Sequence, residues 1–514
     1  MNGAQSLIGT LVRSDVEVCF TNPGTSEMHF VAALDHEPDM RAVLVLFEGV
    51  ATGAADGYAR MSDKPAASLL HLGPGLANGL ANLHNAKKAR SPVVNIIGDH
   101  ATYHQLLEAP LTSDVKAFAA PVSQWIKSSP NGAEVGHDAA AAVRAANSNG
   151  GQIASLILPA DAAWTPAHDY GVYRKPPSPE IPPGAAIEKI SALLSNGKKT
   201  SILMTGRALR ARGLEAASRI AAKSGAQIFA DTFNARSERG AGRYGIKRLP
   251  YFAEQIVETL AGTEQLIIVG SQSPVSFFAY PDIPNYLVPE GCATYVLATH
   301  AEDAIGGLEA VAEEIKAPQN PEGKMELIRP DLANGGDIAT AVWAAMAHYM
   351  PDNSIVVDEA TTSGLASEMF LANAPQHDYL QLTGGSIGIG LPLSLGASIA
   401  CPDRKVICGH GDGGAMYTLQ ALWTQARENC DVVNIIFSNR KYMILEIEIM
   451  RVGAENVGPK ALDMFDLSRP NLDWCQLANG MGVHAMRASS VDEVNQAMAH
   501  CMGTKGPHLI EVII

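Results

Sequence analysis

The stretch from Gly409 to Tyr442 constrains the fold of this chain more than any other segment. An apolar run breaks at Gly411-Asp412-Gly413-Gly414, an amphipathic segment follows over 419–427, and a second apolar run over 432–437 ends in Ser438-Asn439. This change of period from strand to helix and back predicts one βαβ unit. Both polar clusters would then lie beyond the carboxyl ends of parallel strands, where open α/β sheets bind ligands.

The chemistry of these two clusters suggests a phosphate–metal site. Asp412 and Asn439 offer hard oxygen ligands, which suit Mg²⁺ held by a few protein groups and by phosphates. Gly413 and Gly414 leave backbone N–H groups free to approach a phosphate. Alternatively, the glycines only form a tight turn and Asn439 only caps a helix. The spacing of both clusters within one βαβ unit favours the site.

Length and composition limit the possible architectures and partners. A chain of 514 residues exceeds one ordinary core, so two or three domains are expected. The net charge of −15 argues against nucleic acid or an anionic membrane surface as the main partner. Seven cysteines without CxxC pairs indicate neither a zinc site nor a disulfide framework, and favour a reduced, cytoplasmic setting. No signal peptide or transmembrane run is expected.

Strands alternate with helices in three segments, 1–165, 184–328 and 335–514, which predicts three doubly wound parallel-sheet α/β domains. The proline-rich stretch 165–184 is typical of a linker. No GxGxxG motif occurs in the central segment, so neither a nucleotide nor FAD is predicted there. Beyond the opening stretch, strands are expected at 16–20, 43–47, 66–70, 93–97, 201–204, 266–269 and 354–357, and helices at 4–14, 49–60, 77–89 and 391–399.

Several polar residues stand at predicted strand ends. Glu48 lies between an apolar run and a helix of small residues, 49–60, which is expected to pack closely against a neighbour. Desolvation there would raise the pKa of Glu48 and prepare it for proton exchange. The alternative is a glutamate that simply favours a helix start. His71 precedes Gly73-Pro74-Gly75, although a lone histidine is usually structural. Thr361 and Thr362 either bind phosphate oxygens or cap the next helix.

These motifs together resemble a known family. The GDG motif is followed after 27 residues by Asn439, Glu48 stands in FEGVATGAADGYARM, and Gly384-Gly385-Ser386-Ile387-Gly388 precedes the GDG. The pattern resembles thiamin-diphosphate-dependent enzymes of the pyruvate oxidase-like group, which includes acetolactate synthase, benzoylformate decarboxylase and pyruvate decarboxylase. The resemblance covers essentially the whole chain. It implies pyrimidine-binding, middle and diphosphate-binding domains, in that order.

The resemblance also implies a set of cofactor ligands. Mg²⁺ would be bound by Asp412, Asn439 and the backbone oxygen of Lys441. The Gly385 carbonyl and the Glu48 carboxylate would bond the pyrimidine, and Ile387 would force the bent cofactor conformation. The remaining expected contacts to thiamin diphosphate are Thr361, Thr362, Gly411, Gly413, Gly414 and Tyr442.

The implied chemistry is decarboxylation of a 2-oxo acid. Glu48 would promote formation of the cofactor ylide, which attacks the oxo group, and carbon dioxide would leave an enamine. The enamine yields an aldehyde, or a 2-hydroxy ketone after attack on an aldehyde or a second oxo acid. Alternatives are a C–C lyase or hydrolase and a non-catalytic cofactor-binding homologue. Family members place Glu48 in the partner's site, which implies a homodimer at the minimum and favours a homotetramer.

Local residues relate the chain to benzoylformate decarboxylase only in part. Asn22–Glu27 resembles the opening loop of that enzyme, with Thr25 at the position of a substrate-binding serine, and His71 matches an active-site histidine. Pro110 and Leu111 are expected to line the substrate pocket. A second active-site histidine is missing, with Ala279 near its position, which would favour carboligation. No role is assigned to His100 or His104, and Glu446 and Glu448 are expected on a solvated helix face.

Overall fold

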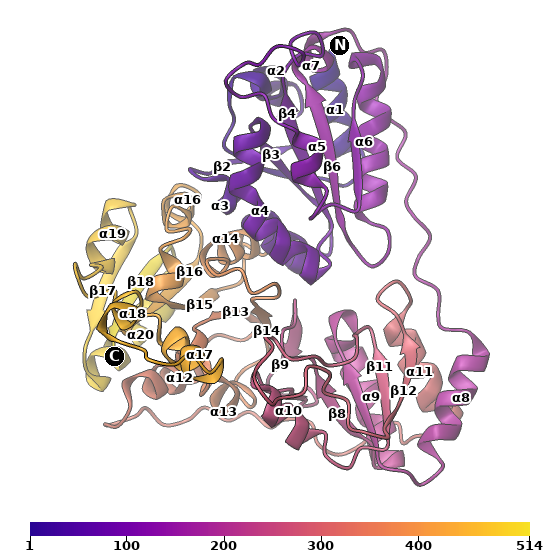
Figure 1. Ribbon diagram of the computed structural model, residues 1–514, viewed down its shortest axis with the longest axis vertical. Helices are drawn as coiled ribbons and strands as arrows, with labels where there is room; N and C mark the ends of the chain where they lie inside the picture. The colour runs from indigo at the N-terminus through magenta and orange to yellow at the C-terminus, as the bar shows by residue number, and fades with distance from the viewer.

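Three β-sheets of six, five and seven strands organise the computed structural model, which describes residues 1–514 (Figure 1). Each sheet comes mainly from one of the three predicted segments, and helices cover the sheets. The predicted α/β class with three parallel-sheet domains is confirmed, with one antiparallel exception described below. None of the helices combines the length and apolar composition needed to cross a bilayer.

The amino-terminal sheet has the order β2-β1-β3-β4-β6-β5, and every pair in it is parallel. Both faces of this sheet are buried. Successive residues of a strand point to opposite faces, so neighbours in the sequence enter different cores. Leu69 packs in a core with Leu7 and Val143, whereas Leu70 packs in another core with Val50. The elements are β1 (Val18–Thr21), β2 (Arg41–Leu44), β3 (Ala66–Leu70), β4 (Val93–Asp99), β5 (Trp125–Ser128), β6 (Ile153–Pro159), α1 (Gly3–Val12), α2 (Met28–Ala33), α3 (Glu48–Ser62), α4 (Leu72–Ala89), α5 (Val115–Ala119), α6 (Gly132–Ala146) and α7 (Ala160–Trp164).

The central domain follows a segment without helix or strand that spans residues 165–183 (Figure 1). Its parallel sheet has the order β10-β8-β7-β11-β12, with apolar cores on both faces. The elements are β7 (Thr200–Met204), β8 (Gln227–Ala230), β10 (Lys247–Arg248), β11 (Gln265–Val269), β12 (Ala293–Ala298), α8 (Gly184–Leu194), α9 (Ala211–Ser224), α10 (Ala253–Thr259) and α11 (Ala304–Glu314).

The carboxyl-terminal sheet has the order β17-β18-β16-β15-β13-β14-β9. Its edge strand β9 (Ser237–Arg239) comes from the central segment and pairs antiparallel with β14, which departs from the predicted all-parallel sheet. Three residues are too few to show a strand pattern in the sequence. The other elements are β13 (Ser354–Glu359), β14 (His377–Gln381), β15 (Val406–Gly411), β16 (Val432–Ser438), β17 (His484–Ala488), β18 (His508–Ile513), α12 (Ile338–Tyr349), α13 (Ser367–Leu371), α14 (Gly390–Ala400), α15 (Asp412–Ala415), α16 (Ala421–Arg427), α17 (Met443–Arg451), α18 (Pro459–Asp463), α19 (Trp474–Gly480) and α20 (Val491–Gly503).

The first and third domains share one apolar core, because helix α3 packs directly on helix α14. A Cβ atom on Gly396 would lie 1.9 Å from the carbonyl oxygen of Ala54, and one on Gly57 would lie 2.2 Å from that of Leu393. The helices therefore meet backbone to backbone, as the small residues after Glu48 predicted. Any larger side chain at these glycines would force the two domains apart.

Some element boundaries differ from the sequence-based expectation. Strand β2 ends at Leu44 rather than at residue 47, because Phe47 already serves as the N-cap of α3. Helix α4 begins at Leu72, so Gly73-Pro74-Gly75 forms its first turn instead of a preceding loop. Proline is tolerated there because the first N–H groups of a helix have no intrahelical partner.

Candidate active site

Three neighbouring strands of the carboxyl-terminal sheet carry the predicted phosphate–metal residues. Strands β13, β15 and β16 are hydrogen-bonded neighbours, with Glu359 opposite His410 and Gly411 opposite Phe437. The loops that follow them contain Thr361-Thr362, Asp412–Gly414 and Asn439–Tyr442. The expected βαβ unit is present, although its connection contains two short helices, α15 and α16, in place of one.

Asp412 is a buried carboxylate without a cationic side-chain partner. Its side chain is only 2% exposed and accepts hydrogen bonds from the backbone N–H groups of Gly413 (2.8 Å) and Arg440 (2.7 Å). Burial raises the pKa of Asp412 despite these bonds. The side-chain oxygen of neighbouring Asn439 accepts from the Lys441 N–H at 3.1 Å. A buried carboxylate beside an amide oxygen is a donor set that fits Mg²⁺, whose charge would stabilise the ionised carboxylate.

The glycines of this loop allow close packing of the neighbouring loops. A Cβ atom on Gly413 would lie 2.3 Å from the ring of Tyr442, whose hydroxyl group is 3.5 Å from the Gly413 carbonyl oxygen. One on Gly411 would lie 3.6 Å from the Thr361 hydroxyl oxygen. The predicted diphosphate-binding residues on different loops are thus in mutual contact.

Backbone strain is found next to these predicted site residues. Thr361, Arg440 and Leu72 adopt left-handed backbone conformations, with φ of 51°, 57° and 49° respectively. Such a conformation costs a residue with a side chain about 1–3 kcal/mol, most for a β-branched residue such as threonine. Arg440 separates the predicted metal ligands Asn439 and Lys441, and Leu72 follows His71. Surrounding contacts therefore hold these loops in one fixed shape.

A buried pair that the sequence did not reveal supports the loop with Gly385 and Ile387. Glu359 and His410 are 3% and 0% exposed, and their side chains approach to 3.0 Å. The Glu359 carboxylate accepts hydrogen bonds from the N–H groups of Gly388 (2.5 Å) and Gly390 (2.6 Å). This contact fixes one end of the loop on strand β13.

The other end of the same loop is held by the amino-terminal domain through Asn85. This fully buried side chain donates to the Ser386 carbonyl oxygen (2.8 Å) and accepts from the N–H groups of Gly384 (3.1 Å) and Ser386 (3.3 Å). His84 Nε2 donates to the Gly384 carbonyl oxygen at 3.0 Å. The loop with the two predicted cofactor contacts is therefore clamped between two domains.

Glu48 is the first residue of α3, and its expected burial is confirmed by an exposure of 8%. Asn78, which was not predicted, donates to its Oε2 atom at 2.9 Å. The other oxygen, Oε1, makes no hydrogen bond and lies beside Gly75, where a Cβ atom would be 3.3 Å away. Glu48 forms no hydrogen bond to Asp412 or Asn439 within the chain.

His71 lies in a second polar cluster on the amino-terminal domain. Its Nδ1 atom is 2.7 Å from Glu27 Oε2 and 3.4 Å from the Ser26 hydroxyl oxygen. Glu27 is fully buried, accepts from the Gly24 N–H at 2.8 Å, and leaves Oε1 without a partner. Glu27 was not predicted as a site residue, although it belongs to the Asn22–Glu27 loop. Thr25 is exposed, and the neighbouring Ser26 is the hydroxyl residue beside His71.

A loop without regular structure, residues 100–114, lies beside this cluster. It contains exposed Pro110 and half-buried Leu111, whose carbonyl oxygen accepts from the Ser113 hydroxyl at 3.1 Å. A Cβ atom on Gly73 would lie 2.2 Å from that hydroxyl oxygen, so the loop packs against the first turn of α4. His100 and His104 pair within it, with ring centroids 5.1 Å apart.

The expectation of a solvated face for Glu446 and Glu448 is wrong for Glu448. Glu446 is half-buried and pairs with Lys441 at 3.0 Å. Glu448 is only 8% exposed and accepts from the Tyr280 hydroxyl at 2.8 Å. Aromatic residues of the central domain cover this side of α17, which one chain's helical pattern does not reveal.

Comparison with known proteins identifies the family. Residues 1–119 match the thiamine pyrophosphate enzyme N-terminal TPP binding domain, and residues 359–512 match the corresponding C-terminal TPP binding domain. The chain is 49% identical over 517 residues to a Mycobacterium tuberculosis protein named "Putative acetolactate synthase large subunit IlvX", covering 100% of this chain and 99% of that protein. It is 28% identical over 527 residues to benzoylformate decarboxylase of Pseudomonas aeruginosa, covering 98% and 97% of the two chains.

Solved structures agree on the fold. A thiamine diphosphate-dependent 4-hydroxybenzoylformate decarboxylase of Rhodococcus jostii superposes with a TM-score of 0.86 at 23% identity, covering 100% of this chain and 99% of that one. Benzoylformate decarboxylase of Polynucleobacter necessarius gives 0.86 at 21% identity, with coverage of 100% and 98%. With both family domains matched and a relative at 49% identity along its whole length, the chain belongs to the thiamine pyrophosphate-dependent enzymes.

Proposed function

We propose that this enzyme uses thiamin diphosphate and Mg²⁺ to decarboxylate a 2-oxo acid and releases an aldehyde or a 2-hydroxy ketone. The observation that carries the proposal is the buried Glu48 carboxylate, fixed by Asn78 through one oxygen and free at the other. Mere binding of a cofactor does not require a positioned proton-exchanging group. Its presence therefore favours catalysis over a non-catalytic binding role.

The residues of this site fit the cofactor and its metal. Asp412, Asn439 and the Lys441 carbonyl would hold Mg²⁺, and the Gly385 carbonyl and Ile387 would contact the organic rings. Thr361, Thr362, Gly411, Gly413, Gly414 and Tyr442 would hold the diphosphate. The bound cofactor supplies an electron sink for the carboxylate's bonding pair. In keeping with the family resemblance, we infer that Glu48 serves the site of a second copy, so that a homodimer is the smallest active unit.

His71 and Glu27 are suited to substrate handling. The Glu27 carboxylate fixes the imidazole through Nδ1, so that Nε2, which has no hydrogen bond, can meet a substrate carboxylate or deliver a proton. Thr25, Pro110 and Leu111 would line the same pocket. We assign the active form to a homotetramer in the cytoplasm, and light scattering with and without cofactor measures the assembly.

An aromatic cluster supports an apolar substrate side chain. Phe277 faces Gly385, where a Cβ atom would lie 2.8 Å from its ring. Its ring centroid lies 5.5 Å from that of Phe233, 5.4 Å from that of Tyr251 and 4.8 Å from that of Phe278. Phe277 and Phe278 remain 43% and 50% exposed, which leaves apolar surface for a ligand beside the predicted cofactor loop.

The decisive experiment measures carbon dioxide release from aliphatic and aromatic 2-oxo acids with thiamin diphosphate and Mg²⁺, and identifies the products by chromatography. Aldehyde alone indicates a decarboxylase, and a 2-hydroxy ketone indicates carboligation. Absence of carbon dioxide from every acid, with the cofactor bound, would contradict the proposal. Turnover of a ketone without any 2-oxo acid would instead support a C–C lyase or hydrolase.

A further inference from the structure

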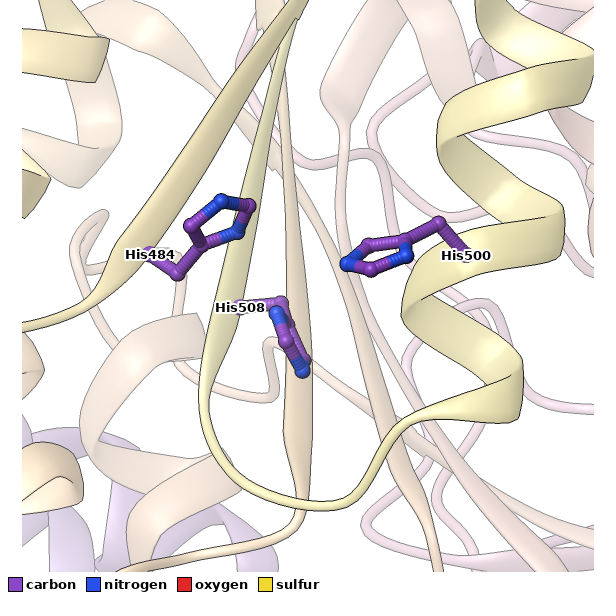
Figure 2. Close-up of side chains that lie close together, drawn as sticks. All are labelled: His484, His500 and His508. Atoms are coloured by element: carbon purple, nitrogen blue, oxygen red, sulfur yellow. The ribbon is translucent and has the colours of Figure 1, made fainter.

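Three histidines converge at the far end of the carboxyl-terminal sheet from the cofactor loops. His484 and His508 are the first residues of β17 and β18 and lie side by side in register, and His500 belongs to the last turn of α20 (Figure 2). His508 also pairs with Val433 at the beginning of β16, whereas Asn439 follows the end of that strand. The histidine cluster is therefore separate from the candidate active site.

The geometry of the cluster is that of three ligands around one point. All three pairs of ring centroids are 5.8 Å apart, and one ring nitrogen from each histidine lies within 4.8 Å of the others (Figure 2). A tetrahedral zinc ion with Zn–N bonds of about 2.0–2.1 Å requires nitrogen separations of roughly 3.4 Å. His484 and His500 are exposed, so rotation of their side chains can close this gap without disturbing a core.

His508 supplies the second observation that indicates a ligand. It is only 6% exposed, and neither of its ring nitrogens has a hydrogen-bond partner of acceptable geometry. A buried polar group without a partner is costly, so the unpaired imidazole of His508 indicates a place for a ligand.

The charge of Lys405 does not exclude a metal. This lysine acts electrostatically on His508. Its ammonium group, however, is bound by the Asp431 carboxylate at 2.7 Å and by the carbonyl oxygens of Cys501 and Thr504 at 3.3 and 2.8 Å. The Asp431 carboxylate offsets much of the lysine charge.

We propose that His484, His500 and His508 bind a divalent transition metal, with Zn²⁺ as the best match for three imidazoles and a water molecule. Imidazole ligands suit Zn²⁺, Ni²⁺ and Cu²⁺, and disfavour Mg²⁺ and Ca²⁺, which require oxygen ligands. The ion would join two strand starts to the end of α20 and so stabilise the sheet edge. This inference does not depend on the proposed function.

Calorimetric titration with zinc tests the proposal by measuring how many zinc ions bind and how tightly. The sample is the full chain, saturated with thiamin diphosphate and Mg²⁺. One zinc ion per chain should bind and raise the melting temperature by a few degrees. H484Q/H500Q changes only exposed side chains and removes two of the three ligands. It should therefore weaken zinc binding by more than the about 10–100-fold that follows the loss of a group that only orients a ligand. The control H137Q removes an exposed histidine of another helix, α6, and should bind zinc as the unmodified chain does.

A second variant separates this site from the predicted Mg²⁺ site. In D412A, zinc should still bind once per chain with unchanged affinity, because Asp412 lies at the opposite end of the sheet. Absence of zinc binding to the unmodified chain, or equal affinity in H484Q/H500Q, would overturn the proposal. Loss of the zinc site in D412A but not in H484Q/H500Q would do so as well.

Discussion

Replacing Asn85 by alanine should release the loop that carries Gly385 and Ile387. The side chain forms three hydrogen bonds with that loop, to Gly384 N–H, Ser386 N–H and the Ser386 carbonyl. Each bond contributes about 1 kcal/mol net, so about 3 kcal/mol of loop ordering is lost. Because 1.4 kcal/mol corresponds to a factor of ten, the ordered loop should be about 100-fold less populated relative to open forms. Thiamin diphosphate affinity should fall by up to the same factor.

Two measurements follow this change independently. Deuterium uptake of the peptide over residues 383–388 reports loop opening without cofactor, and fluorescence titration reports cofactor affinity. N85D keeps both accepted bonds but sets a carboxylate oxygen against the Ser386 carbonyl oxygen, so it should cost more than the loss of one bond. H84A removes one bond and should cost about 1 kcal/mol. N147A is the control, because Asn147 bonds Val143 and Tyr173 away from the loop. If N85A and N147A showed equal uptake and equal affinity, the clamp would have no role.

Three further predictions concern catalysis, the metal and acid stability. E48Q should lower turnover by about 10²–10⁴-fold with little change in cofactor affinity, since it removes proton exchange but keeps the shape; near-normal turnover would refute that role. Removing Mg²⁺ with a chelator should weaken cofactor binding measured by titration, and so should D412A. Adding the chelator to the D412A variant should then have no further effect. Burial lowers the pKa of His377 to about 4 from 6.5, so the unfolded chain takes up a proton that the folded chain does not between these two pH values. Stability should therefore be complete above pH 6.5, fall by about 3 kcal/mol between pH 6.5 and 4, and level off below pH 4. Urea unfolding at several pH values should show a shallower loss for H377Q; equal slopes would contradict this explanation.

The sequence predicted those parts of the fold and the site that depend on patterns of neighbouring residues. The GDG motif, Asn439 and Glu48 stand at transitions between apolar strands and helices, and the fold places these transitions at strand ends and helix starts as predicted. The same patterns predicted the close contact of α3, because runs of small residues permit helices to approach closely. Strand ends such as that of β2 were less predictable, since capping by Phe47 overrides a continuous apolar run.

Residues that act through distant contacts were not predictable from one chain. Asn78, Asn85, Glu359 and His410 carry no local motif, and their roles come from partners distant in sequence. Glu27 stands in a recognisable loop, but its contact with His71 becomes apparent only in the fold. Asn85, for example, bonds Ser386, 301 residues later. Glu448 was misjudged for the same reason, because the aromatic residues that bury it belong to another domain. The three histidines likewise meet only when β17, β18 and α20 assemble.

The placement of β9 bears on how the chain is made as well as on how it is held. Ribosomal synthesis delivers residues 237–239 long before β14 at 377–381, so the strand that covers this edge already exists when the edge forms. An uncovered strand edge is a template for association with other chains, and large proteins are most exposed to it while folding. We therefore expect the central domain to protect the nascent carboxyl-terminal sheet from aggregation on one side. A truncation that removes β9 should leave a chain that precipitates rather than an isolated domain.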